Sequence, residues 1–299
     1  MVGSVRRFNR TVTQRIGALD DSFLARGRPL SQARVLWEIG PDGTSVRALR
    51  SRLGLDSGYL SRILRALEAD GLIAVGADER DRRVRAVRLT RAGRAERGEL
   101  DRRSDDMAAE ILRPLTARQR ERLAAAMDEA ERLLTASMIG ITATDPRAPD
   151  ARRCLRAYFA ELSSRFDSGF DPALSIPASD DDLRPPAGVL LIAALRDEPV
   201  GCGALKLHDD APAEIKRMWV SPAVRGLGVG RRLLAELEAH ATARGARTLR
   251  LETNRALTEA IGLYRSAGYR EVSAFNEEAY AHHWFEKTLT ADSVSQLAL

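Results

Sequence analysis

The stretch VSPAVRGLGVGRRLLAELEAHA, Val220 to Ala241, joins an apolar strand end to an amphipathic helix through a turn that contains three alternating glycines. Glycine lets the backbone turn tightly and aims several N–H groups at one point. The helix expected over Arg231–Ala243 begins at that point, and a helix N-terminus attracts anions because its first N–H groups lack partners. The stretch therefore predicts a phosphate-binding loop between a strand and a helix.

Two nucleotide-binding patterns fit this loop poorly. It lacks the Lys-Ser/Thr pair of a Walker loop, and a dinucleotide fingerprint would place its glycines after a first strand that crosses over to a parallel partner. Here three expected strands precede the loop, over residues 188–196, 200–208 and 213–220, after a helix expected over 150–166. A nucleotide-binding function is therefore not favoured.

The motifs around the loop are more specific. The form R-x-x-G-x-G from Arg225 to Gly230, with W-V-S-P before it and R-R-L-L after it, strongly resembles the acetyl-CoA loop of the GNAT acyltransferases. The family's downstream signature, L-Y-x-x-x-G-[FY], is matched by Leu263, Tyr264, Gly268 and Tyr269. The resemblance covers about residues 140–289. It implies an α/β fold with a mixed central sheet flanked by helices, and an N-acetyltransferase that passes an acetyl group from acetyl-CoA to an amine by direct attack on the thioester.

The same resemblance implies roles for individual residues. Backbone groups of Met218 and Val220 would hold the pantetheine arm of the cofactor. The pyrophosphate would lie on N–H groups of the loop, contributed by Arg225, Gly226, Leu227, Gly228, Val229, Gly230 and Arg231. Asn254 is also expected near the cofactor, although it stands further before Tyr264 than is common in the family.

Acetyl transfer needs a base for the amine and an acid for the departing thiolate. Tyr264 is the candidate acid, because its helix packs beside the thioester in this fold. Glu214 is the candidate base, acting directly or through water, and Glu252 on the next strand competes for that role. The alternative is that Tyr264 is only a packed core phenol and Glu214 only a salt-bridge partner at a strand edge.

A second stretch, DSGYLSRILRALEADGLI from Asp56 to Ile73, predicts a helix suited to a DNA groove. Asp56 caps it, and a short Gly-Leu-Asp connection from the preceding helix fits a helix-turn-helix. Its apolar stripe consists of Leu60, Ile63, Leu64 and Leu67. A charged hairpin follows, with Arg80, Arg82 and Arg83 in its loop, and predicts a wing.

This order of elements, with a D-x-R wing tip and an L-T-x-x-G exit, resembles the MarR family of winged-helix regulators. Asp81, Arg83, Leu89, Thr90 and Gly93 stand where the pattern puts them, and the resemblance covers about residues 8–137. It implies a homodimer on a roughly palindromic operator in double-stranded DNA. The candidate DNA-binding residues are Ser57, Ser61, Arg62, Arg65, Arg82 and Arg83, with Asp81 orienting Arg83. The alternative is a winged helix that serves only protein contacts.

Long helices flank this unit. Apolar residues at spacings of three and four predict one continuous first helix with a stripe through Val5, Phe8, Val12, Ile16, Leu19 and Phe23. Further helices are expected over 91–111 and 116–138. Helices of this length usually pack together or across a dimer.

The charge differs between the halves of the chain. Residues 1–138 carry 27 Arg, no Lys and 20 acidic residues, a net +7, whereas residues 139–299 carry 20 basic and 22 acidic residues, a net −2. A basic half beside a slightly acidic one indicates that one domain meets a polyanion. Coding bias can explain the choice of Arg over Lys, but not its uneven distribution.

Length and composition agree with two globular domains, which we place at 1–138 and 139–299, and Pro146 and Pro149 mark the entry to the second. The longest apolar run is too short for a bilayer and the start lacks a secretory segment, so no membrane contact and a cytoplasmic location are expected. Cys154 and Cys202 are expected to be reduced and buried, and no metal site is predicted. The long polar segment 167–187, with acidic residues at 180–182, is a candidate functional loop.

These patterns predict a DNA-binding regulator fused to an acetyltransferase. One alternative keeps both folds but makes the second domain an acyl-CoA sensor without turnover. Another is an enzyme whose winged helix only dimerises.

Overall fold

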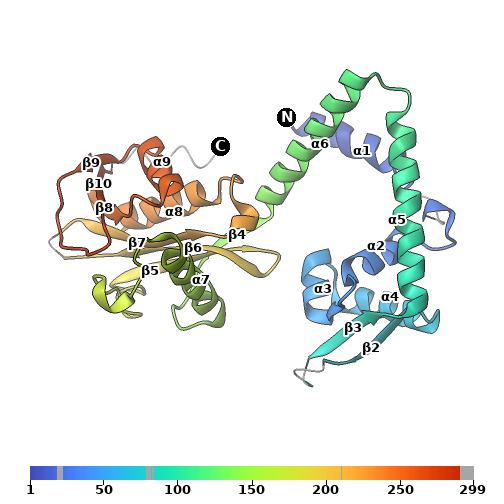
Figure 1. The fold of residues 1–299 in the computed structure, drawn as a ribbon, viewed down its shortest axis with the longest axis horizontal. Helices are drawn as coiled ribbons and strands as arrows, with labels where there is room; N and C mark the ends of the chain where they lie inside the picture. Colours follow the sequence, from blue (N-terminus) through green and yellow to red (C-terminus); the bar gives the residue numbers. More distant parts are fainter. Residues whose placement is uncertain (19–22, 79–81, 83, 210, 290–299) are drawn as a thin grey trace. The chain divides into compact units, whose positions relative to one another are not determined.

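The computed structural model describes residues 1–18, 23–78, 82, 84–209 and 211–289. The chain divides into two compact units, Met1–Met127 and Asp128–Leu299 (Figure 1). The division falls inside one helix, α6 (Ala117–Ser137), whereas the predicted limits at 138 and 139 lie at the end of that helix. Among the described residues, no helix is long and apolar enough to cross a membrane.

The first unit is mainly helical with one small sheet. Its elements are α1 (Val2–Arg15), the 3-10 helix η1 (Phe23–Ala25), α2 (Leu30–Ile39), β1 (Thr44–Ser45), α3 (Val46–Leu53), α4 (Ser57–Ala69), β2 (Ile73–Ala77), β3 (Arg85–Leu89), α5 (Arg91–Leu112) and the first part of α6. The strands are antiparallel, in the order β1-β3-β2. The winged helix-turn-helix architecture predicted from sequence is therefore confirmed, with β2 and β3 as the wing.

The predicted first helix is too long. It ends at Arg15, and Gly17 follows with φ 61°, a left-handed conformation that commonly ends a helix. Phe23 does not continue the stripe but lies in η1, 4% exposed, with its ring edge-on to Trp37 at 6.1 Å. Leu19 lies outside the described residues. The apolar spacing continues past Gly17, but the helical conformation ends before it.

Capping groups hold the helix-turn-helix, and the cap predicted at Asp56 is confirmed. The Ser45 hydroxyl accepts a hydrogen bond from the Ala48 N–H at the start of α3, and the Asp56 carboxylate accepts one from the Tyr59 N–H, 2.8 Å away, at the start of α4. Gly54 between the two helices has φ 62°. The predicted stripe of α4 is buried in the core of the unit, at Leu60, Ile63, Leu64 and Leu67.

The second unit is an α/β domain, and its predicted class is confirmed. Its elements are the end of α6, β4 (Ile139–Ala143), α7 (Pro149–Arg165), η2 (Pro172–Leu174), β5 (Gly188–Leu195), β6 (Glu198–Lys206), β7 (Ala213–Val220), η3 (Pro222–Val224), α8 (Val229–Ala243), β8 (Thr248–Thr253), α9 (Thr258–Ser266), β9 (Arg270–Val272) and β10 (His283–Thr288). The sheet order is β4-β5-β6-β7-β8-β10-β9, and only β7 and β8 pair in parallel.

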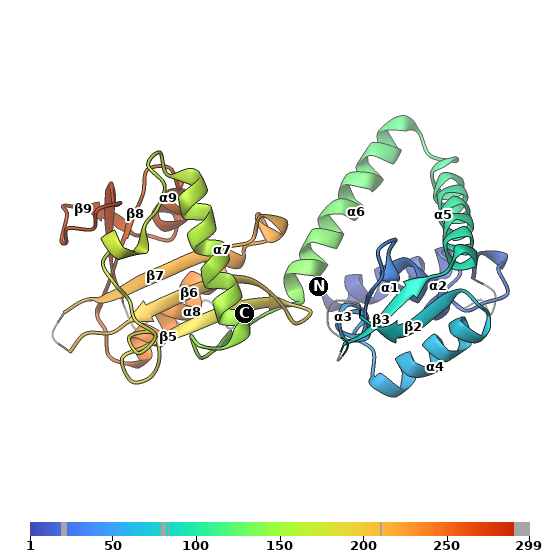
Figure 2. The same ribbon diagram turned by 60° about the horizontal axis from the view of Figure 1, so that its bottom comes forward.

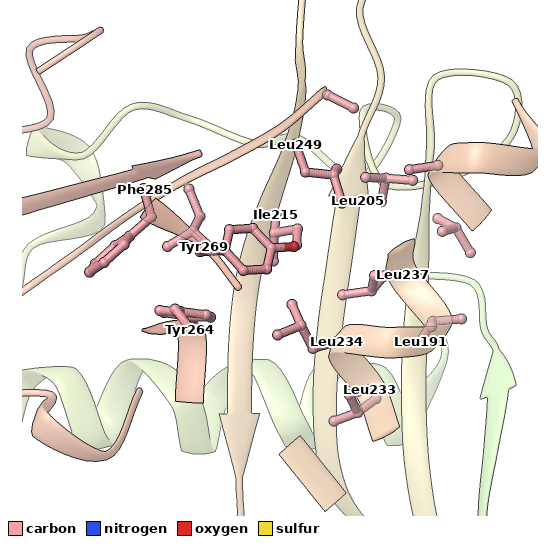
Figure 3. Close-up of a cluster of buried hydrophobic side chains, with 14 of the residues drawn as sticks. Leu191, Leu205, Ile215, Leu233, Leu234, Leu237, Leu249, Tyr264, Tyr269 and Phe285 are labelled. Carbon is pink, nitrogen blue, oxygen red and sulfur yellow. The ribbon is translucent and has the colours of Figure 1, made fainter. Parts of the chain in front are cut away.

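Helices cover both faces of this sheet, with α7 on one side and α8 on the other (Figure 2). Alternate residues of β5 follow the two faces: Leu191 packs with the α8 side chains, and Leu190 packs with those of α7. Figure 3 shows the α8 side, where Tyr264 of α9 lies among Tyr269, Phe285 and aliphatic side chains. A sheet buried on both faces explains the continuous apolar run of β5.

Candidate functional site

The two parallel strands of the second unit separate soon after they meet. They pair only at Ala213↔Leu249 and Glu214↔Arg250, although β7 continues to Val220. Beyond Glu214, the backbone N–H and C=O groups of β7 that face β8 have no strand partner in the part of the chain that the structure describes. A strand edge of this kind can bind an extended ligand through its backbone.

A β-bulge lies in the unpaired part of β7. Its register with β6 shifts between Cys202↔Trp219 and Ala204↔Lys216, so that Arg217 and Met218 together oppose Gly203. Arg217 has φ 59°, which is uncommon for a residue with a side chain. Bulges often re-aim side chains beside active sites, and this one lies where the two strands part.

The glycine turn follows directly after β7. Gly226 and Gly228 have φ values of 78° and 76°, which favour glycine. The first helical bond of α8 runs from the Arg232 N–H to the Gly228 carbonyl, and no side chain caps the helix. The N–H groups of the first residues of α8 therefore lack helical partners and can hold an anion.

The turn and the strand edge line one cavity of about 440 Å³. Its walls include eight predicted cofactor residues from the strand, the turn and the start of α8: Met218, Val220, Arg225, Gly226, Gly228, Val229, Gly230 and Arg231. Leu227 is different, because its side chain packs on the core. The cavity thus contains most of the residues predicted to hold acetyl-CoA.

A carboxylate from α7 fixes the wall beside the turn. Glu161 accepts hydrogen bonds from Arg225 Nη2 at 2.6 Å and from Trp219 Nε1 at 2.9 Å. Burial alone would raise the pKa of Glu161, but the hydrogen bonds from Arg225, Trp219 and Arg165 outweigh it and lower that pKa. Arg225 is therefore held in place as an ion pair.

A second, smaller cavity of about 90 Å³ adjoins this site. Its polar wall carries Lys216, Arg217, Glu252 and Glu278, and its apolar wall carries Phe166, Phe170 and Tyr280. Lys216 Nζ pairs with Glu252, and Glu278 accepts hydrogen bonds from the Ser175 hydroxyl at 2.9 Å and the Ile176 N–H at 2.7 Å. Part of the predicted functional loop, residues 170–178, thus contributes to this cavity.

The two cavities share six lining residues: Tyr158, Leu162, Met218, Leu257, Ala260 and Tyr264. Tyr264 is 5% exposed, and no hydrogen bond joins its hydroxyl to any described residue. Burial raises the pKa of Tyr264, and it raises the pKa of Tyr158 to about 12. Both phenols are therefore protonated at neutral pH and can donate a proton or a hydrogen bond where the cavities meet.

Two predicted site residues lie elsewhere. Glu214 lines neither cavity; it belongs to the paired part of β7, forms an ion pair with Lys216, 3.0 Å away, and lies 3.3 Å from Nε2 of His208. Asn254 also lines neither: its side-chain amide donates to the Tyr280 carbonyl at 2.7 Å, and its side-chain oxygen accepts from the Ala256 N–H. Glu214 as a base and Asn254 as a cofactor ligand are thus not supported by position.

The predicted groove face of α4 is exposed at Ser57, Ser61, Arg62 and Arg65. The Ser61 hydroxyl donates to the Ser57 carbonyl at 2.7 Å, and the Arg62 guanidinium lies 5.7 Å from the Tyr59 ring centre. Arg82 is exposed in the wing turn. Asp81 and Arg83 lie outside the described residues.

Other expectations concerned metals and thiols. Among the described side chains no group of three or more His, Cys, Asp or Glu is placed to hold a metal ion. Cys154 and Cys202 are free and buried, as predicted. The acidic residues Asp180, Asp181 and Asp182 all pair with basic side chains, so they are engaged in ion pairs.

The sequence interpretation missed several residues of the site. Tyr158 and Glu161 lie three residues apart on α7, within an otherwise ordinary amphipathic pattern, and nothing in that pattern distinguishes them. Lys216 and Arg217 offered a weak signal, because adjacent cations in a central strand are unusual. Their positions depend on the bulge, which the sequence did not reveal.

Fold and site together define a winged-helix unit joined to an acyltransferase-type unit. The model described as the GNAT acetyltransferase family matches residues 155–269, and that described as the MarR family matches residues 26–84. An uncharacterised N-acetyltransferase from Schizosaccharomyces pombe is 30% identical over 128 residues, which are 39% of this chain and 77% of that protein. The chain therefore belongs to the GNAT acetyltransferase family, whose cofactor is acetyl-CoA, and carries a MarR-family domain before the GNAT domain.

Two further similarities are partial. An IAA acetyltransferase from Azospirillum brasilense is 40% identical over 86 residues, 28% of this chain, so the match spans little more than half of that relative, 56% of its length. An acetyltransferase of known structure from Streptococcus agalactiae is 20% identical, with a TM-score of 0.42, and the similarity covers 51% of this chain and 99% of that one.

Proposed function

We propose that the second unit transfers an acetyl group from acetyl-CoA to a primary amine. The observation that carries this proposal is the meeting of two cavities at Tyr264, beside the gap between β7 and β8. The larger cavity has the strand edge and glycine turn that suit a pantetheine arm and a pyrophosphate. The smaller cavity opens to the same point and suits an acceptor.

In this mechanism acetyl-CoA supplies a thioester carbon that is open to attack. Backbone groups of Met218 and Val220 align the pantetheine arm, and N–H groups from Gly226 to Arg231 bind the pyrophosphate. As the amine nitrogen bonds to the carbonyl carbon and the carbon–sulfur bond breaks, Tyr264 gives its proton to the departing sulfur. The positions of these groups support the assignment of Tyr264 as the acid.

The proposed base is Glu252 in place of Glu214. Glu252 lies beyond the last β7–β8 pair and lines the smaller cavity, where the acceptor amine would bind. It takes the amine proton directly or through a water molecule, and its ion pair with Lys216 fixes the position of the carboxylate on the wall of the smaller cavity. Glu252 and Tyr264 thus place a base and an acid on the same small cavity.

The test is release of free CoA from acetyl-CoA, followed with a thiol reagent, over a panel of small amines, amino acids, aminoglycosides and peptides. Release with at least one amine, above the rate of hydrolysis, supports transfer. Tight acetyl-CoA binding without release from any amine contradicts transfer and favours the alternative of a cofactor sensor.

For the first unit the proposal is binding to a palindromic operator in double-stranded DNA. Its support is the exposed Ser/Arg face of α4, the exposed Arg82 and the net charge of +7 over residues 1–138. Phosphate contacts release counterions, so binding to a duplex should weaken steeply as salt increases. Absence of salt-dependent duplex binding would favour a winged helix that only mediates protein contacts.

A homodimer is the proposed assembly, with the cytoplasm as the proposed location because chromosomal DNA and acetyl-CoA are both present there. Helix α1 buries no residue within the described chain, and Val5 and Phe8 are 54% and 47% exposed. An apolar stripe of this kind favours a second copy as its partner. Sedimentation at several concentrations tests the assembly.

A further inference from the structure

Arg217 stands out among the charged groups of the smaller cavity. Lys216 pairs with Glu252 and Glu214, and Glu278 is bonded to the loop at Ser175 and Ile176. The Arg217 guanidinium instead makes no ion pair or hydrogen bond to any residue that the structure describes. Its contacts are with aromatic faces, at 4.7 Å from the Phe159 ring centre and 5.9 Å from that of Tyr158.

The backbone positions this side chain. In a regular strand, consecutive residues point to opposite faces, yet Ile215, Lys216, Arg217 and Met218 all line the smaller cavity. The bulge and the left-handed φ of Arg217 account for this arrangement. A strained backbone that aims a cation into a cavity is typical of a functional position.

The aromatic contacts leave the hydrogen-bonding edge of the guanidinium available. Stacking on a ring occupies the flat face of the guanidinium, whereas its five N–H donors lie in the plane and match a carboxylate. The rings also pack on one another. The Phe159 and Phe170 rings are stacked with centroids 5.7 Å apart, and the Phe170 and Tyr280 centroids are 4.8 Å apart. Arg217 is thus a preorganised donor beside an apolar wall.

We propose that Arg217 binds a carboxylate of the acceptor, so that the acceptor is a small amine that also carries a carboxylate, as an amino acid does. The inference rests on the proposed function, because it assigns the smaller cavity to the acceptor. The cavity of about 90 Å³ suits a small molecule. Its Phe166, Phe170 and Tyr280 favour an apolar or aromatic side chain on that acceptor.

The experiment measures binding and turnover separately on the full chain. Calorimetry with CoA present compares each member of a panel of L-amino acids, L-phenylalanine included, with its carboxamide and its decarboxylated amine. A charge-assisted bidentate pair predicts that the best acid binds about 10- to 100-fold more tightly than its amide. Equal affinity of acids and amides, or no binding of any acid at millimolar concentration, overturns the inference.

Three variants locate the preference. Arg217→Asn removes the cation but tolerates a left-handed backbone, and should abolish the preference for acids. Arg217→Lys should restore part of it. The matched control is Arg250→Asn: Arg250 also lies over an aromatic ring, Phe275 at 5.1 Å, but lines neither cavity, and its loss should leave the preference unchanged.

Acetyl-CoA affinity should stay the same in both Arg217 variants, because this residue does not line the larger cavity. An unchanged preference for acids in Arg217→Asn overturns the assignment to Arg217. Different outcomes contradict the two proposals. Acid-selective binding without CoA release contradicts acetyl transfer but not recognition of the carboxylate. CoA release at equal rates with acids and amides contradicts recognition of the carboxylate but not acetyl transfer.

Discussion

Replacing Tyr264 with Phe removes one hydroxyl from the point where the two cavities meet. The ring remains, with its contacts to Tyr269 and Phe285 at centroid distances of 6.0 Å. Because the hydroxyl has no hydrogen-bond partner among the described residues, its loss breaks no bond within the protein. The variant therefore separates chemistry from packing.

The expected loss is large for turnover and small for stability. A general acid contributes about 10²- to 10⁴-fold, which at 1.36 kcal/mol per factor of ten is about 2.7–5.4 kcal/mol of the barrier. A hydrogen bond lost within the fold would cost about 1 kcal/mol, and none is lost here. We expect kcat to fall by at least a hundredfold, with acetyl-CoA affinity and Tm unchanged.

The assay is steady-state CoA release with an amine identified in the acceptor screen, beside calorimetry for acetyl-CoA and a thermal melt. Since burial raises the pKa of Tyr264, the wild-type rate should show no decline from ionisation of this phenol below about pH 10. A variant that keeps its turnover within about threefold but melts at a lower temperature would show that the phenol is structural.

The remaining predictions concern the cofactor, DNA, assembly and pH. Gly228→Asp places a negative charge near the proposed pyrophosphate site, with a repulsion of about 4 kcal/mol for two unit charges 4 Å apart, and should abolish acetyl-CoA binding in calorimetry. Gly228→Asn is the neutral control. Equal loss of binding in both variants would show that the backbone conformation, and not the charge, is responsible. In gel shifts, Arg62→Ala should cost about 1–3 kcal/mol on a specific operator, whereas Arg82→Ala should weaken all duplexes about evenly; no loss in either contradicts the proposed DNA surface. Phe8→Asp should convert a dimer to a folded monomer in sedimentation, and an unchanged dimer would exclude α1 from the interface. The free energy of unfolding should fall above pH 10, by about 1.4 kcal/mol per pH unit for each buried tyrosine, because the folded pKa is raised and the unfolded phenol ionises first; a flat denaturation midpoint between pH 10 and 12 would contradict this.

Features set by neighbouring residues could be predicted from the sequence. The cap at Asp56 and the buried stripe of α4 depend on side chains within one or two helical turns. The glycine turn was also predictable, because a positive φ at Gly226 and Gly228 is a local property. The end of α1 was not, since the apolar spacing continued past Gly17 although the helix did not.

Features set by strand pairing could not be predicted in the same way. Glu214 and Glu252 are both carboxylates on strands beside the cofactor loop, and only the register places Glu214 in the paired segment and Glu252 in the gap. The bulge at Arg217 has the same origin, because it exists only relative to Gly203 of β6. The position of Asn254 outside both cavities could not be predicted either, because its hydrogen-bond partner, the Tyr280 carbonyl, is remote in sequence.

Helix α6, which begins in the winged-helix unit, ends against the cofactor loop. Arg132 near its end donates to the Gly226 carbonyl at 3.0 Å, and Arg232 of α8 donates to the Ala136 carbonyl, also at 3.0 Å. The loop proposed to hold the pyrophosphate is thus bonded to the part of α6 that belongs to the second unit, in a helix that begins in the first unit. Thermodynamic linkage makes any such coupling reciprocal: by whatever factor acetyl-CoA changes the affinity for an operator, the operator changes the affinity for acetyl-CoA. Occupancy of the proposed operator would then change the acetyl-CoA concentration at which the enzyme is half saturated.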